Sequence, residues 1–132
     1  MKIFKYLFLL SIGLIAVNCV KKHQIFTAQF DITSPHGLFS EGLYYLKNKN
    51  YEYALRSFYT LVEDFPTDSL ADDAQFYVAE ILANPQNPNR NLLEAISEYQ
   101  NLIKNYPESP FVLKAQKQLI KLQKIQKSNK KR

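Results

Sequence analysis

Two segments of this 132-residue chain repeat each other at a constant spacing of 41 positions. Residues 52–69 read EYALRSFYTLVEDFPTDS and residues 93–110 read LEAISEYQNLIKNYPESP, so Ala54 pairs with Ala95 and Phe58 pairs with Tyr99. In each copy, a small residue, an aromatic residue and a leucine fall on one face of a helix, and a proline then ends that helix. Such copies bury their apolar faces by stacking on one another, which predicts an array of repeated helical units.

The spacing of apolar residues elsewhere in the chain is also helical. A 3.6-residue period predicts five helices, over 36–48, 51–65, 69–83, 91–105 and 110–127. Asparagine and proline residues separate these segments, most densely in the run NPQNPNRN at 84–91. No alternating pattern typical of a β-strand competes with them, so we expect an all-α fold.

The composition excludes most catalytic and metal-binding chemistries. One cysteine and two histidines provide neither a zinc site nor a catalytic triad. Three glycines are too few for a phosphate-binding loop, which uses two or three of them in a single turn. We therefore expect no enzymatic activity, no metal and no cofactor. Residues 23–110 carry twelve acidic and five basic side chains, so we expect no nucleic acid partner.

The first residues resemble the signal of a bacterial lipoprotein. Lys2 and Lys5 precede the apolar run YLFLLSIGLIAV at 6–17, which is too short to span a bilayer. The end of the run forms the first half of the lipobox-like sequence Ala16-Val17-Asn18-Cys19. The resemblance implies that residues 1–18 are removed and that Cys19 is acylated, for example with palmitate. Val20 follows the cysteine in place of an inner-membrane retention aspartate, which implies an outer-membrane, periplasm-facing location. An incidental cysteine in a leader cut elsewhere, or an uncleaved anchor, remains the alternative.

The repeated helices resemble the tetratricopeptide repeat (TPR), a helix–turn–helix unit. The matching positions of the first repeat are Leu38, Gly42, Tyr45, Ala54, Phe58, Leu61 and Pro66. Those of the second are Val78, Ala79, Leu82, Ala95, Tyr99, Leu102 and Pro107, with four extra residues in its internal turn. The resemblance implies a solenoid of two helical hairpins and a C-terminal capping helix. The expected organisation is a signal peptide (1–18), a lipidated tether (19–35), the TPR-like domain (36–127) and a basic tail (128–132).

A TPR array binds a partner peptide in its concave groove, which the first helix of each repeat lines. Transferred by register, the groove positions are His36, Phe39, Leu43, Leu46, Asp73, Phe76, Glu80, Ala83, Lys114, Lys117, Lys121 and Lys124. The four lysines share one helical face, opposite an apolar stripe. A row of lysine side chains beside an apolar surface of the groove would suit a hydrophobic peptide that carries acidic groups or a free carboxylate. The alternatives are a solvated face of the last helix and a contact with anionic lipid.

The ends of the repeats resemble those of one TPR family, the lipoproteins of the outer-membrane β-barrel assembly machinery (BamD-like). The matching elements are Phe65-Pro66, Ser69, Ala74-Gln75, Tyr106-Pro107 and Ala115-Gln116. The resemblance implies a scaffold that binds the barrel insertase and other subunits of that machinery, and that helps to engage unfolded barrel substrates. Members of that family carry more repeats than this chain. The alternative is a periplasmic TPR adaptor that coordinates peptidoglycan synthesis or envelope constriction.

Overall fold

The computed structural model describes residues 30–129 of the chain. Five helices form this part: α2 (Pro35–Lys47), α3 (Tyr51–Asp64), α4 (Ala71–Ala83), α5 (Leu92–Asn105) and α6 (Val112–Asn129). The described residues contain no strand, so the predicted all-α class and all five helices are confirmed, with ends that differ by a few residues. The predicted signal peptide, Cys19 and the last three residues lie outside the described part.

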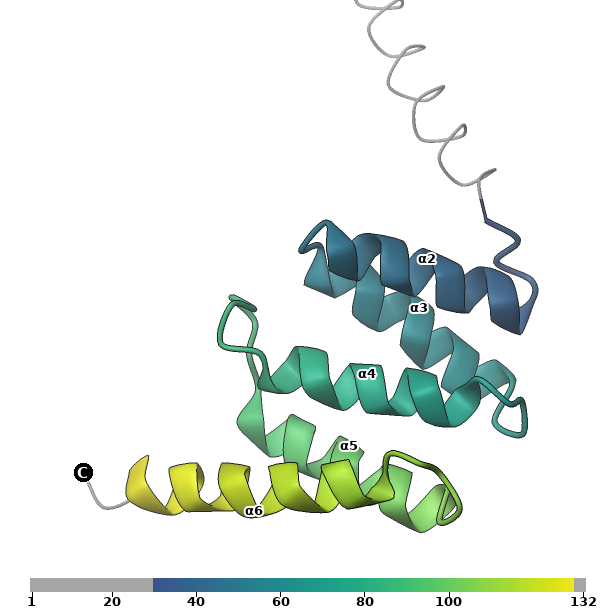
Figure 1. Cartoon of the computed structure of the whole chain (residues 1–132). Helices are drawn as coiled ribbons and strands as arrows, with labels where there is room; N and C mark the ends of the chain where they lie inside the picture. The colour runs from purple at the N-terminus through teal and green to yellow at the C-terminus, as the bar shows by residue number, and fades with distance from the viewer. Residues whose placement is uncertain (1–29, 130–132) are drawn as a thin grey trace, which may run out of the picture.

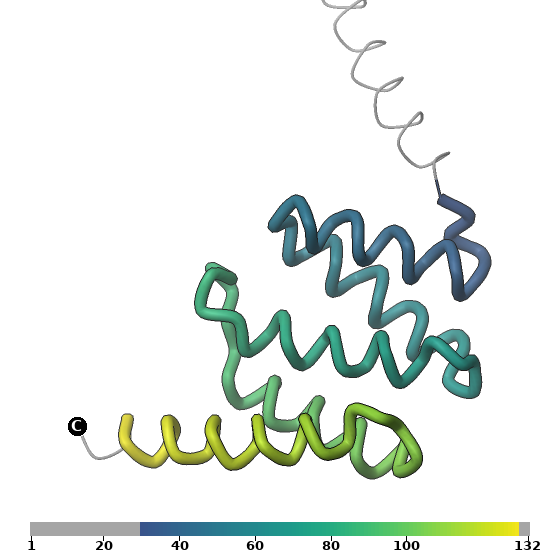
Figure 2. The backbone as a smooth tube through the Cα atoms, in the orientation of Figure 1, coloured from purple at the N-terminus to yellow at the C-terminus, as the bar shows by residue number. Residues whose placement is uncertain are grey.

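The helices stack in chain order as antiparallel hairpins (Figure 1). α2, α4 and α6 follow one another down the molecule in one layer, and α3 and α5 lie between them in a second layer. Each helix packs mainly against the next helix in the chain. The tube in Figure 2 shows the resulting superhelical course from α2 to α6. This confirms the predicted solenoid of two helical hairpins with a capping helix.

The repeated positions form the core. Ala54, Phe58 and Leu61 of α3 are fully buried, and so are their counterparts in α5, the residues Ala95, Tyr99 and Leu102. A Cβ atom added at Gly42 would lie 2.6 Å from the Phe58 ring, so the glycine lets α2 pack directly on that ring. Ala79 occupies the corresponding place in the second hairpin and is fully buried. Small residues at these points set the distance between the two helices of each hairpin.

The two hairpins also end in the same way. Phe65 and Tyr106 end α3 and α5 with similar backbone conformations, at φ −132° and ψ 54° for Phe65 and φ −128° and ψ 61° for Tyr106. The Tyr106 hydroxyl donates to the carbonyl oxygen of Pro66 at 3.1 Å, which joins the end of one repeat to the end of the other. No helix among residues 30–129 combines the length and the apolar character needed to cross a bilayer.

Candidate functional site

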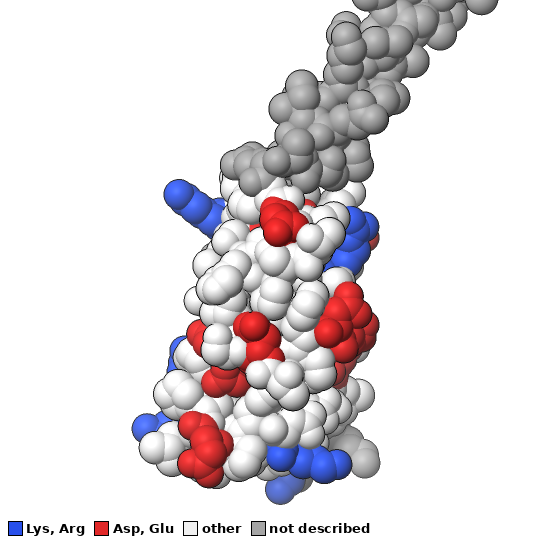
Figure 3. All heavy atoms as spheres, turned by 90° about the vertical axis from the view of Figure 1, so that its right-hand side faces the viewer, with Lys and Arg blue, Asp and Glu red and all other residues white. Residues whose placement is uncertain are grey.

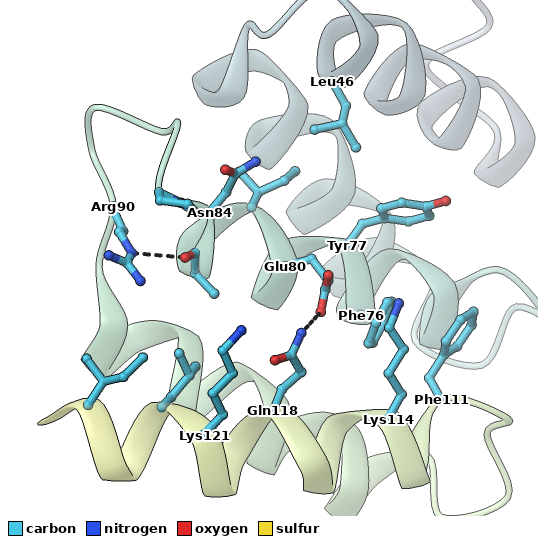
Figure 4. Close-up of a pocket in the computed structure, with 15 residues that line it drawn as sticks. Leu46, Phe76, Tyr77, Glu80, Asn84, Arg90, Phe111, Lys114, Gln118 and Lys121 are labelled. Carbon is cyan, nitrogen blue, oxygen red and sulfur yellow. Dashed lines mark hydrogen bonds between the residues drawn. The ribbon is translucent and has the colours of Figure 1, made fainter.

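A pocket of about 520 Å³ opens on the layer of α2, α4 and α6 (Figure 4). α4 and α6 supply most of its wall, and Leu46 of α2 reaches it from above. Leu46, Ile81, Leu122 and Ile125 provide apolar surface. The charged residues of its wall are Arg90, Lys114, Lys121 and Glu80. A concave apolar surface with a few converging polar groups is the usual form of a ligand site.

Phe76 forms the end of the pocket near the start of α6. Its side chain is only 3% exposed and stacks on Phe111, with ring centroids 4.5 Å apart and planes 13° apart. The Lys114 ammonium lies 4.5 Å from the centroid of the Phe76 ring, a cation–π arrangement. Phe76 is therefore covered by its neighbours, and it supports the position of the lysine instead of forming an open apolar floor.

Glu80 of α4 is held by two donors on one oxygen. The Tyr99 hydroxyl, from the fully buried side chain of α5, and the Gln118 amide of α6 both donate to Oε1 of Glu80, the amide at 3.1 Å. Burial and the adjacent Glu80 carboxylate raise the pKa of Tyr99, so the phenol remains a donor. Glu80 is the one carboxylate among the described residues that line the pocket, and its direction is fixed from both sides.

The inserted turn at 84–91 closes the end of α4 and places Arg90. The buried Asn87 donates from Nδ2 to the carbonyl oxygen of Ile81 at 3.0 Å, and the Asn91 backbone N–H donates to that of Leu82 at 3.0 Å. Arg90 donates from Nε to the carbonyl oxygen of Ala83 at 2.9 Å. These bonds satisfy carbonyls that a helix end leaves open. They also hold the Arg90 side chain at the rim of the pocket, as Figure 4 shows.

The pocket is electropositive although most of the surrounding chain is acidic. None of Arg90, Lys114 and Lys121 forms an ion pair with any residue between 30 and 129, so three positive charges face one carboxylate. Figure 3 shows that acidic side chains gather on another side of the molecule, where the α3–α4 and α5–α6 turns lie. The charge of the pocket therefore favours a ligand that carries negative groups.

The structure places half of the predicted groove residues at the pocket. Those that line it are Leu46, Phe76, Glu80, Ala83, Lys114 and Lys121. Those that do not line it are His36, Phe39, Leu43, Asp73, Lys117 and Lys124. Cys19, the predicted lipidation site, lies outside the described residues.

The difference follows from how the helices stack. The pocket lies between α4 and α6, so α4 contributes the side that faces the next hairpin and α6 contributes the side that faces back. Lys117, which corresponds to Phe76 at the 41-residue spacing, is exposed on α6 and does not line the pocket. Phe39 fills the equivalent junction one hairpin earlier, with its ring centroid 5.6 Å from that of Phe58 and 5.8 Å from that of Tyr77.

The predicted groove lacked nine residues of the wall, which are Tyr77, Ile81, Asn84, Pro85, Arg90, Phe111, Gln118, Leu122 and Ile125. Gln118 and Ile125 follow Lys114 at the spacing of one helical face, so a second register on the last helix could have identified them. Arg90 had no such signal, because it lies in the inserted turn.

Between residues 30 and 129, no group of three or more His, Cys, Asp or Glu side chains is placed to hold an ion. The adjacent Asp72 and Asp73 begin α4, and burial, with a smaller effect from Asp72, raises the pKa of Asp73. This pair belongs to the start of a helix.

Residues 73–109, which comprise nearly all of α4 and the whole of α5, match the tetratricopeptide-repeat family model. None of the curated proteins compared with the chain matches it. The second repeat predicted from the sequence is therefore confirmed as a TPR, and the stacking of the described helices is TPR-like. Because repeats of this kind generally mediate protein–protein interactions, the match indicates a protein-binding scaffold.

Proposed function

We propose that this TPR-containing chain is a lipid-anchored scaffold of the outer membrane that acts in the assembly of β-barrel proteins. Cys19 at the end of the apolar leader supports the anchor, and the Phe-Pro and Tyr-Pro ends of the two hairpins support the likeness to scaffold lipoproteins of the barrel-assembly machinery. Its partners would be the barrel insertase, other subunits of that machinery and unfolded barrel substrates. The proposed role is binding without catalysis, and it needs no cofactor besides the covalent lipid.

The observation that carries the proposal is the pocket. Arg90, Lys114 and Lys121 surround an apolar surface, and Tyr99 and Gln118 fix the single carboxylate in place. A short extended segment that combines apolar side chains with a carboxylate has the chemistry to fill this space. Positive charge beside an apolar surface selects such a segment over a purely hydrophobic one.

The test is to recover the partners of the full-length, lipid-modified protein from its own envelope in mild detergent and to identify them by mass. The expected result is a barrel protein with large periplasmic domains. A Cys19→Ser variant, expressed at the same level, is the control for membrane anchoring. Recovery of peptidoglycan synthases or constriction proteins instead would contradict the assembly role and favour the alternative adaptor role.

A further inference from the structure

The first hairpin exposes apolar side chains at the end of the molecule that is farthest from α6. Seven large apolar residues are exposed among residues 30–129, and four belong to α2, to α3 or to the turn before them. These four are Ile32, Leu43, Tyr44 and Tyr53. In Figure 1 this hairpin lies at the top of the stack, where the chain enters the described part, and α6 lies at the bottom.

Aromatic rings connect this surface into a continuous row, which we define as Phe30, Tyr44, Tyr45 and Tyr53. Successive ring centroids are 5.7 Å apart for Phe30 and Tyr44, 5.7 Å for Tyr44 and Tyr45, and 5.0 Å for Tyr45 and Tyr53. The Arg56 guanidinium lies 5.4 Å from the centroid of the Tyr53 ring at the end of the row. Tyrosine, which has an apolar ring and a polar hydroxyl, is enriched on surfaces that meet the boundary between lipid and water.

The charges of the hairpin are balanced. Residues 30–56 contain three Lys or Arg residues and three Asp or Glu residues, namely Lys47, Lys49, Arg56, Asp31, Glu41 and Glu52. Glu41 accepts a hydrogen bond from the Ser57 hydroxyl at 2.8 Å, which lowers the cost of placing its carboxylate near an apolar phase. Attraction to anionic head groups is therefore a minor contribution here, and the tyrosines would provide the affinity.

The chain enters the hairpin at a fixed point beside this row. The Ser34 side chain accepts from the Gly37 N–H at 3.2 Å, and Asp31 lies so close to Gly37 that an added Cβ would overlap its carbonyl oxygen. Phe30, directly before this turn, contacts Tyr44. If Cys19 is acylated, the ten residues from Val20 to Gln29 can span at most about 36 Å. The anchor therefore keeps the first hairpin close to the bilayer, so that even a weak surface affinity is sufficient.

We propose that the aromatic row rests in the interfacial layer of the membrane to which Cys19 is anchored, an inference that depends on the lipid anchor of the proposed function. The stack of helices then projects from the bilayer with α2 and α3 nearest to it. The pocket between α4 and α6 faces the aqueous compartment, where a partner can reach it.

The test uses single tryptophan probes, because the chain contains no tryptophan. Full-length lipidated Tyr44→Trp and Leu113→Trp variants are reconstituted in phosphatidylcholine vesicles whose acyl chains carry bromine near the head groups. Leu113, which is 71% exposed on α6, is the matched control at the far end of the stack. We expect bromine to remove most of the emission of the Tyr44→Trp variant and little of that of the Leu113→Trp variant.

A Tyr53→Trp variant repeats the measurement at the other end of the row if the first probe disturbs the fold. Quenching confined to the Leu113→Trp variant, quenching of neither end, or a signal for Tyr44→Trp that appears only when anionic lipid is added would each overturn the proposal. So would a blue shift of the same probe that follows protein concentration in detergent, because it would assign the row to a second copy of the chain. Acylation of Cys19, measured by mass on the same samples, separates a failure of the anchor from a failure of the aromatic contact.

Discussion

At the scale of single residues, Glu80 connects the core to the pocket. Tyr99 reaches it from the buried side of α5 and Gln118 reaches it from α6, and both donate to the same oxygen. The carboxylate is therefore satisfied without the nearby lysines, which keeps Lys114 and Lys121 available to a ligand.

Two lysines of α6 provide a matched pair for testing the pocket. Lys121 lines it and Lys117, one turn earlier, does not, although both are exposed and carry the same charge. We expect Lys121→Glu to weaken partner binding about tenfold, which corresponds to about 1.4 kcal/mol. Lys117→Glu should change binding little, because it alters the net charge equally without entering the pocket. Equal recovery of the partner with both variants in the envelope experiment would contradict the assignment.

The ionisation of Asp73 should make the stability of the protein depend on pH. Burial, followed by the neighbouring Asp72, raises the pKa of Asp73 above its ordinary value, so the folded state holds this proton more tightly than the unfolded state does. Stability is therefore greater below the unfolded pKa and is reduced as the pH rises through the folded pKa. We expect Asp73→Asn to melt at a higher temperature than the wild type at neutral pH.

That difference should shrink in acid, where the wild-type carboxyl is also neutral. Thermal melts across the acidic range test this, with Glu108→Gln in an exposed turn as the control for losing one negative charge. A difference that is constant with pH would show that Asp73 acts through something other than its ionisation.

At the scale of elements, the approach of α2 to α3 depends on Gly42. Alanine favours a helix over glycine by about 1 kcal/mol, but its Cβ would lie 2.6 Å from the fully buried Phe58 ring. We expect overpacking to prevail, with a net loss of about 1–3 kcal/mol in the free energy of unfolding. Urea denaturation measures it, and Ser40→Ala on the exposed side of α2 is the control. An increase in the stability of the Gly42→Ala variant would contradict this expectation, because it would show that α2 and α3 can move apart to accommodate the methyl group at little cost.

The inserted turn is the second element with a clear test. Asn87 is 3% exposed, donates to the Ile81 carbonyl and accepts from the Asn89 N–H at 2.9 Å, so Asn87→Ala removes both of these side-chain hydrogen bonds. We expect a loss of about 1–3 kcal/mol in stability. Partner binding should also weaken, because Arg90 depends on the same turn. The control is Asn89→Ala, whose side chain is exposed; comparable losses in both variants would contradict a specific role for Asn87.

At the scale of the whole molecule, stability should vary along the stack. Each helix packs mainly against its sequence neighbours, so α3, α4 and α5 have a packed helix on both sides while α6 has one. We expect backbone amides of α3 to α5 to exchange most slowly with deuterium, and those of α6 beyond Leu122 to exchange fastest. Exchange followed by mass spectrometry on the full chain checks this. Uniform protection of all five helices would show instead that the array unfolds as one cooperative unit.

The lysines of α6 show how well the spacing of residues in the sequence predicts which of them line the pocket. All four lysines of the predicted groove are exposed on α6, but only Lys114 and Lys121 line the pocket. A groove between two stacked helices is lined by one face of each helix. The two faces do not consist entirely of equivalent positions of the repeat. A single register transferred along the chain therefore selects some residues that do not line the pocket.

The sequence by itself determined the helices, the fold class and the core, because the 41-residue repeat marks the small, aromatic and apolar positions that two helices must bury together. The positions of Ala54, Phe58 and Leu61 followed directly from that pattern. Only the tertiary structure decided which sides of α4 and α6 face each other, how the inserted turn delivers Arg90, and that Phe76 is covered by Phe111 and Lys114. Helical periodicity is local along the chain, whereas a pocket depends on the rotation and offset of helices that meet only after folding.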